Sequence, residues 1–228
     1  MAFFDEAAQK YDSWYKTPMG RFVDEVETRL AFDMFTPQKG MSILDCGCGT
    51  GNFSIKLAEK GAQVTGVDIS TEMMAVAGEK ARQRGLNIKF VESDICNLVF
   101  PDNSFDAVFT MAVFETIPDS QRAFQEMMRV LKPGKFLLIG TIRKDAPWGR
   151  SYEKRVQESP DSIWRFSTFK SLEEFKDLDR KNLVKVGHCL YVPPNQAPEK
   201  YNMAEEEKLS KTETGGFMVG LWQKPVKG

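Results

Sequence analysis

The sequence has 228 residues, of which 42% are hydrophobic and 28% charged, and its net charge at pH 7 is -1. A chain of this length and composition is an ordinary globular protein that can bury well over half of its unfolded surface. The near-zero charge provides no general attraction to nucleic acid or to an anionic membrane. No run of 18 apolar residues is present, so no segment is long enough to span a bilayer. We therefore expect neither a nucleic acid nor a membrane as a partner.

The N-terminus and the cysteines bear on the cellular compartment. The opening "MAFFDEAAQK" has acidic residues where a signal peptide would carry a basic region followed by an apolar stretch. Four cysteines stand at the uneven positions 46, 48, 96 and 189, which is not the framework of a secreted disulfide-rich domain. We expect a cytoplasmic protein whose cysteines are reduced.

Strand and helix patterns alternate through the middle of the chain. Short apolar runs typical of buried strands lie at 42–46, 62–68, 87–93, 105–111 and 135–141. Amphipathic stretches between them predict helices over 52–61, 71–84 and 120–131. This alternation predicts right-handed crossovers and a parallel sheet that is covered by helices on both faces.

The two ends of the chain depart from that alternation. Residues 3–35 predict two helices that precede the sheet, and residues 145–182 predict helices inserted after the fifth strand. Two further strands are expected within 182–192 and 216–224. The polar segment 193–215 between them is longer than most loops of a compact domain, so we expect it to be functional or mobile.

Three glycines follow the first predicted strand and indicate a ligand site. Gly47, Gly49 and Gly51 allow a tight turn and a close approach of a ligand to the backbone. The helix that follows offers unpaired N–H groups and the positive end of its dipole. Asp68 ends the second predicted strand, where a carboxylate can accept two hydrogen bonds from a ribose diol. Together they predict a cofactor that contains a nucleoside.

The spacing of the loop bears on which cofactor this is. The dinucleotide fingerprint G-x-G-x-x-G/A requires Gly or Ala at position 52, where this chain has Asn52. An NAD site is therefore the less favoured interpretation. Asp94 and Ile95 follow the third strand, where a carboxylate and a backbone N–H could read the edge of an adenine.

Five segments carry a family resemblance when they are taken in order. They are "ILDCGCGTG", "VTGVDIS", "SDI", "FDAVFTMAVFETIPD" and "RVLKPGKFLLIG", which together cover about residues 40–142. With them the chain resembles the class I S-adenosylmethionine-dependent methyltransferases, in the small-molecule branch often called type 11. The opening "YDSWYKTPMGRFVDEVE" is similar to the lead-in of one bacterial and archaeal subgroup of that branch.

The resemblance implies an α/β fold with a Rossmann-like seven-stranded sheet. The strand order is 3-2-1-4-5-7-6, the last strand is antiparallel, and helices cover both faces. Residues 1–228 would form a single methyltransferase domain with an N-terminal helical lid at 1–38 and a cofactor-binding core at 40–142. The helical insertion 143–182 and the loop 193–215 would lie on the substrate side.

The resemblance also implies which residues hold S-adenosylmethionine. The loop would pack against the methionine part, Asp68 would hold the ribose, and the backbone of Thr110 or Met111 would receive the methionine amino group. Tyr11 or Tyr15 would close over the cofactor. The full set of expected cofactor residues is Tyr11, Tyr15, Gly47, Cys48, Gly49, Asp68, Ile69, Met73, Asp94, Ile95 and Met111.

Two residues are candidates for catalysis. Glu115 follows the fourth strand, where the family often places polar residues that face the substrate; it would act as a base or a substrate clamp, or else cap a helix. His188 lies in a predicted strand, where it is either a catalytic base or a satisfied, half-exposed side chain.

Cysteines and aromatic residues have plainer interpretations. A zinc site needs three or four ligands, and with a single histidine in the chain Cys46 and Cys48 are better explained as small buried fillers. We expect no metal. Five aromatic residues fall in the insertion, some of which should line an apolar acceptor pocket: Trp148, Tyr152, Trp164, Phe166 and Phe169.

The predicted activity is methyl transfer to a small-molecule acceptor by in-line displacement. Because the cofactor carries the activated methyl group, the protein mainly holds the two reactants in position, which can lower the barrier by about 7–11 kcal/mol. No side-chain nucleophile is needed, so an amine, thiol or stabilised carbanion suits the sequence better than an unactivated hydroxyl. A non-catalytic protein that binds S-adenosylmethionine and, less favoured, an NAD-dependent oxidoreductase remain as alternatives.

Overall fold

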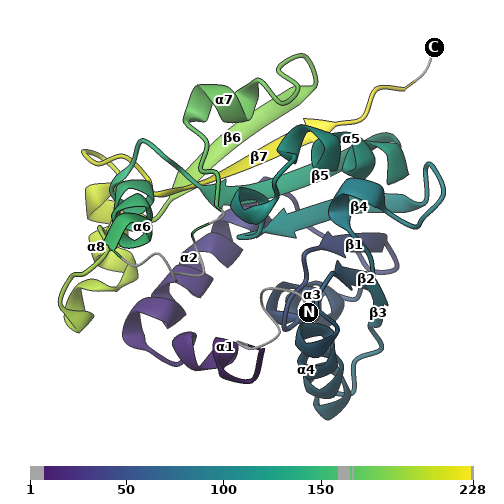
Figure 1. The fold of residues 1–228 in the computed structure, drawn as a ribbon, viewed down its shortest axis with the longest axis horizontal. Coiled ribbons are helices and arrows are strands. Elements are labelled where there is room, and N and C mark those ends of the chain that lie inside the picture. The colour runs from purple at the N-terminus through teal and green to yellow at the C-terminus, as the bar shows by residue number, and fades with distance from the viewer. Residues whose placement is uncertain (1–7, 159–164, 166, 227–228) are drawn as a thin grey trace.

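A seven-stranded sheet in the order β3-β2-β1-β4-β5-β7-β6 forms the centre of the computed structural model, which describes residues 8–158, 165 and 167–226 (Figure 1). Its strands are β1 (Ser42–Cys46), β2 (Gln63–Asp68), β3 (Lys89–Glu92), β4 (Phe105–Met111), β5 (Leu131–Ile142), β6 (Leu183–Cys189) and β7 (Phe217–Gln223). Strands β1 to β5 pair in parallel, and β7 runs antiparallel to both β5 and β6. The predicted fold, including the antiparallel last strand, is confirmed.

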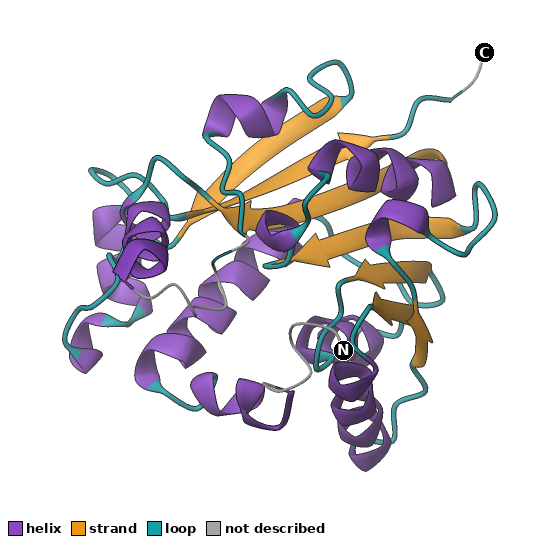
Figure 2. Cartoon of the chain, viewed as in Figure 1, coloured by secondary structure: helices purple, strands orange, loops and turns teal. Residues whose placement is uncertain are grey.

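Helices connect the strands and also precede them (Figure 2). They are α1 (Ala8–Trp14), α2 (Pro18–Met34), α3 (Asn52–Glu59), α4 (Thr71–Gln83), α5 (Ser120–Val130), α6 (Pro147–Glu158), α7 (Leu172–Lys176) and α8 (Met203–Leu209). Short 3-10 turns are η2 (Ile95–Asn97), η3 (Phe114–Thr116) and η4 (Pro198–Lys200). Local signals explain several starts: the Ser70 hydroxyl accepts from the Met73 N–H, and Pro18 follows the N-cap Thr17.

The sheet is buried on both faces by two separate apolar clusters. Alternate residues of one strand point to opposite faces, so Ile43 packs with α2 and α3 whereas Leu44 packs with α5 and α7. Helix α2 lies so close to β6 that a Cβ on Gly187 would come within 2.7 Å of Leu30. The N-terminal helices therefore belong to the folded core, and α1 extends from them toward α4 (Figure 1).

The structure corrects two expectations about element boundaries. Strand β5 begins at Leu131 rather than 135, because Leu131 pairs with Phe105 before a register shift in β4. Segment 193–215 is not an irregular loop, since it contains η4 and α8. Helix α8 is held by Glu206, whose carboxylate accepts from the N–H groups of Tyr191 and Val192 at 2.9 and 3.0 Å.

Two further observations complete the outline. Trp164 and Phe166, which the sequence suggested for the acceptor side, lie outside the described residues. Within the described ranges, no helix combines the length and the apolar character needed to cross a membrane.

Candidate active site

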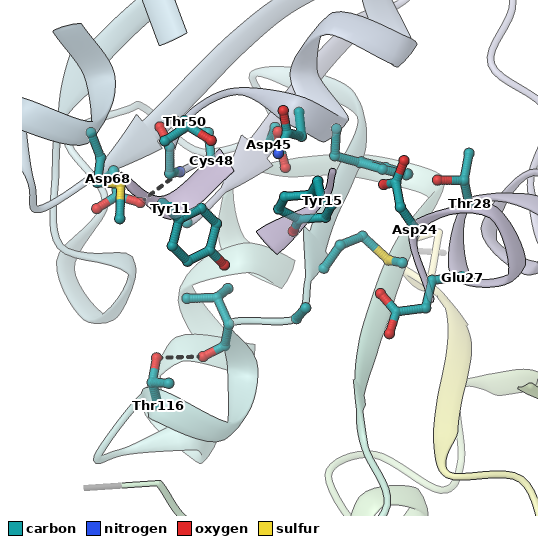
Figure 3. A pocket seen from close by; sticks show the side chains of 18 residues that line it. Tyr11, Tyr15, Asp24, Glu27, Thr28, Asp45, Cys48, Thr50, Asp68 and Thr116 are labelled. Atoms are coloured by element: carbon teal, nitrogen blue, oxygen red, sulfur yellow. Dashed lines mark hydrogen bonds between the residues drawn. The ribbon is translucent and has the colours of Figure 1, made fainter. Parts of the chain in front are cut away.

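A cavity opens where β1, β2 and β4 end, which is where open parallel sheets bind their ligands (Figure 3). Its volume is about 950 Å³ including the part open to solvent. Its walls come from α1, α2, the segment after β4 and the loop 47–51, called the glycine loop below. The lining residues are Tyr11, Tyr15, Asp24, Glu27, Thr28, Asp45, Gly47, Cys48, Gly49, Thr50, Asn52, Phe53, Asp68, Met73, Met111, Ala112, Val113 and Thr116.

The glycine loop needs its glycines for two physical reasons. Gly47, Gly49 and Gly51 all have positive φ, at 72°, 50° and 78°, a conformation that other residues rarely adopt. A Cβ on Gly47 would also lie 2.5 Å from the Val113 side chain, and one on Gly51 would lie 2.8 Å from Ala77. A Cβ on Gly49 would meet nothing within 4 Å, so this glycine leaves the cavity side of the loop open.

Asp68 is fixed in place by the backbone around it. One carboxylate oxygen accepts from the Gly49 N–H at 2.8 Å, and the other accepts from the Ser70 N–H at 2.9 Å. These two bonds fix the orientation of the Asp68 carboxylate. The arrangement presents an oriented anion beside the loop, as a ribose diol requires.

Asp45 is a buried acid at the base of the same loop. Only 2% of its surface is exposed, and its carboxylate accepts from the Ser54 hydroxyl at 2.5 Å. Burial raises the pKa of Asp45 to about 6. Ser54 lies on α3, so this bond ties the end of β1 to the helix that follows the loop. Asp45 was not among the residues expected to hold the cofactor, although it immediately precedes the loop cysteines and glycines.

Helix α1 is held over the glycine loop by one aspartate. The Asp12 carboxylate accepts from the Thr50 hydroxyl at 2.7 Å, from the Asn52 amide at 3.1 Å and from Lys80 of α4 at 2.5 Å. Tyr11 and Tyr15, from the same helix and its end, thereby reach into the cavity (Figure 3). Burial is the main cause that raises the pKa of Tyr11 to about 12.

The core of this fold is similar to a known protein family. Residues 44–139 match the model of the family described as a methyltransferase domain, which is the stretch that contains the glycine loop and Asp68. Residues 44–139 are thus similar to methyltransferase domains.

Curated relatives share this methyltransferase core. A demethylmenaquinone methyltransferase of Thermus thermophilus is 37% identical over 138 residues, which are 60% of this chain and 62% of that protein. A ubiquinone biosynthesis O-methyltransferase of Coxiella burnetii is 40% identical over 107 residues, covering 47% of this chain and 46% of that protein. The chain thus spans about half to three fifths of the length of the curated relatives that it matches.

Solved structures extend the similarity beyond the core. A possible histamine N-methyltransferase from Thermotoga maritima superposes with a TM-score of 0.75 at 25% identity, covering 97% of this chain and 98% of that one. A methyltransferase structure from Methanosarcina mazei gives a TM-score of 0.62 at 26% identity, over 83% of this chain and 95% of that one. The arrangement of the whole described chain is therefore that of the methyltransferases.

Most of the expected cofactor residues come together in this cavity. Those that line it are Tyr11, Tyr15, Gly47, Cys48, Gly49, Asp68, Met73 and Met111. Three others lie outside its lining. Ile69 is 54% exposed, the Asp94 carboxylate accepts from the Cys96 N–H at 2.8 Å, and Ile95 is buried in the core. Their adenine contacts stay predictions.

One glutamate lines the cavity and a second follows Val113, a residue of its lining; the sequence suggested only the second, Glu115. Glu115 is 1% exposed, one carboxylate oxygen accepts from the Thr141 hydroxyl at 2.8 Å, and the other has no partner in the described structure. Burial raises the pKa of Glu115 to about 7. Glu27 of α2 lines the cavity, and burial, then the charges of Glu115 and Asp24, raise its pKa well above the usual value.

The structure does not bring His188 to the cavity. It lies on β6, where it pairs with Met218 of β7, and its Nδ1 atom is buried without a partner in the described structure. Burial and the nearby charges of Arg143 and Lys176 lower its pKa, so the neutral imidazole is favoured. A role in the reaction for His188 has no geometric support.

The cysteines of the loop behave as packing residues. Cys46 is fully buried and Cys48 is 7% exposed, and burial raises the pKa of both thiols well above the usual value. Because the thiolate is the reactive form, neither is a ready nucleophile. Over the part of the chain that is described, no group of three or more His, Cys, Asp or Glu side chains is placed to hold a metal ion.

Proposed function

We propose that this protein transfers the methyl group of S-adenosylmethionine to a small-molecule acceptor. The observation that carries the proposal is the cavity itself: the open face of Gly49 and the oriented carboxylate of Asp68 meet at its edge, and α1 covers it. The family of the core supports the same cofactor. The relatives named for demethylmenaquinone and ubiquinone biosynthesis support an acceptor that is a small molecule.

The residues of the cavity suit the parts of this cofactor. Asp68 would accept from the ribose diol, and the backbone from Gly47 to Gly49 would contact the methionine part. Met73, which is 2% exposed, would give an apolar wall beside adenine, and the Met111 backbone would receive the amino group. The cofactor, when bound, supplies an activated methyl group on a sulfonium. The chain's own contribution is to align the acceptor, exclude water and take up a proton where the acceptor must lose one.

We also propose a cytoplasmic location. All four cysteines are free in the structure, and the pKa of each thiol is raised above its usual value. Reduced cysteines without disulfide bonds are usual in that compartment.

Calorimetry with S-adenosylhomocysteine, the product form of the cofactor, tests the proposal. We expect wild type to bind it in the micromolar range, about 8 kcal/mol, and to give no heat with NAD. Asp68→Asn should weaken binding by about 1.5–3 kcal/mol for each charge-assisted hydrogen bond that is lost. The matched control is Asp33→Asn, because the Asp33 side chain is 73% exposed at the end of α2.

The outcomes separate the alternatives. Tight NAD binding without heat from S-adenosylhomocysteine would overturn the cofactor assignment, and an unchanged affinity of a folded Asp68→Asn variant would remove Asp68 from the site. A screen of acceptors with methyl-labelled S-adenosylmethionine addresses catalysis. Binding without methyl transfer to any acceptor would favour a non-catalytic binding protein.

A further inference from the structure

We propose that the acceptor is a basic amine whose nitrogen is held by the carboxylates of Glu27 and Glu115, in the part of the cavity that Tyr11 and Tyr15 cover. This inference rests on the proposed function and names its substrate class.

Glu27 is an acid without a counter-charge of its own. It lines the cavity and makes no hydrogen bond or ion pair with any residue that the structure describes. Its carboxylate points into the cavity, at the opposite end of the view from Asp68 (Figure 3). The nearby cation Lys56 is already engaged, since it donates to the Asp24 carboxylate and, at 2.7 Å, to the Thr28 hydroxyl. Glu27 therefore remains available to a positively charged ligand.

Glu115 offers a second acceptor beside the cavity. It lies in η3 between Val113 and Thr116, and both of these neighbours line the cavity. After burial, the charge of Glu115 is among the causes that raise the pKa of Glu27 and of Tyr11. A fully buried oxygen with no partner is costly, and native structures normally satisfy such an atom. An N–H donor from a ligand would satisfy it.

An ammonium group meets these requirements better than the alternatives. It offers three N–H donors and a positive charge to two carboxylates that otherwise repel one another. Tyrosine rings add favourable contacts with a cation. The ring of Tyr152 of α6 stacks on Phe169 at 5.9 Å, and burial, then the charges of Glu27 and Glu115, raise the pKa of Tyr152. A phenol or hydroquinone acceptor carries no positive charge, and an anionic acceptor would be repelled.

The two acids also suit the chemistry of an amine. An ammonium is not a nucleophile, so the bound R–NH3+ first gives one proton to the Glu27 carboxylate. The lone pair of the resulting R–NH2 forms the N–C bond to the methyl carbon of S-adenosylmethionine, while the S–C bond breaks and its electron pair stays on sulfur. The products are R–NH2+–CH3 and S-adenosylhomocysteine. The raised pKa of both glutamates, which is about 7 for Glu115, favours proton uptake by these side chains.

Calorimetry on matched ligands tests the inference. Ethylamine, phenethylamine and tryptamine are titrated into the protein saturated with S-adenosylhomocysteine, each beside its alcohol and its carboxylate analogue. We expect at least one amine to bind at least tenfold more tightly than its alcohol, and no carboxylate to bind. Glu27→Gln and Glu115→Gln should each weaken amine binding at least tenfold. The control Glu25→Gln changes an exposed acid of the same helix and should have no effect.

Three results would overturn the inference: no amine that binds better than its alcohol, amine affinity unchanged in folded Glu27→Gln, or loss of S-adenosylhomocysteine affinity in Glu27→Gln. The last would assign Glu27 to the amino group of the cofactor. Failure of wild type to bind S-adenosylhomocysteine would instead overturn the proposed function. In that case, titration of the amines into the protein without S-adenosylhomocysteine would still test whether an amine binds through Glu27 and Glu115. Methyl-labelled product from the best-binding amine would support both.

Discussion

Glu115 shows how burial changes the acidity of one carboxyl group. Its carboxyl group is 1% exposed and has one hydroxyl donor, Thr141, for its two oxygens. Burial disfavours the ionised form, which explains the raised pKa of about 7. Near neutral pH this side chain can therefore change its protonation state when a charged ligand arrives, whereas an exposed glutamate would already be fully ionised.

The raised pKa of Glu115 predicts a pH-dependent contribution to stability. The folded protein holds a proton up to a pH of about 7, whereas the unfolded chain releases it near 4.5, so this stabilisation is present at low pH and is lost as the pH rises. Relative to Glu115→Gln, the free energy of unfolding of wild type should fall by about 2 kcal/mol between pH 5 and pH 7.5. Urea unfolding at both pH values measures it; an equal difference at both would contradict the shift.

At the scale of the element, α1 is a short helix that depends on contacts with distant segments. It has seven residues, too few to be stable alone, and only Ala8 is buried among them. Asp12 holds it against Thr50 and Asn52 of the glycine loop region and against Lys80 of α4. The bonds of the Asp12 carboxylate therefore hold α1 over the cavity, and the position of Tyr11 depends on them.

Removing this carboxylate should release the helix. We expect Asp12→Asn to speed hydrogen exchange of residues 8–16 by about tenfold, because the ion pair with Lys80 is lost while the rest of the fold is retained. Addition of S-adenosylhomocysteine should slow the same exchange in wild type. Lys10→Gln is the control, because Lys10 is exposed on the same helix. Equal exchange in Asp12→Asn and wild type would mean that α1 is held by its other contacts.

At the scale of the whole molecule, the N-terminal helices and the sheet share one core. Phe109 of β4 is fully buried, and its ring lies 5.5 Å from Phe35 after α2 and 5.6 Å from Phe53 of α3. Because Gly187 has no side chain, α2 can pack closely against β6 at the far end of the sheet. Helix α2 reaches from the cavity to β6. The packing of this helix on the sheet therefore fixes the position of Glu27.

Loss of the Phe109 ring should therefore destabilise the whole protein. We expect Phe109→Ala to lower the free energy of unfolding by about 3–5 kcal/mol, through lost burial and the cavity left behind. Val184→Ala on β6, where the side chain is 52% exposed, should change it by no more than about 0.5 kcal/mol. Urea unfolding monitored by tryptophan fluorescence and by circular dichroism checks both values. A similar small change in both variants would show that this cluster is not part of the common core.

Local patterns in the sequence predicted the strands and helices and part of the candidate site. The apolar run at 42–46 and the one at 105–111 became β1 and β4 with the same bounds, because a strand buried on both faces needs continuous apolar residues. Gly47, Gly49 and Gly51 could be recognised because a left-handed turn at the end of a strand demands glycine. Asp68 followed from its place at the end of the next strand.

Only the tertiary structure decided which acids line the cavity. Glu25 and Glu27 lie on one helix, and nothing in the local pattern separates the exposed one from the one in the cavity; the docking of α2 on β5, β6 and β7 does. The pair of Asp12 and Lys80 joins residues 68 positions apart, and such a contact exists only once the chain has folded. His188 had a plausible residue type, but the strand that carries it ends away from the cavity. Residue type can be read locally, whereas burial and the sharing of one cavity depend on how distant elements pack.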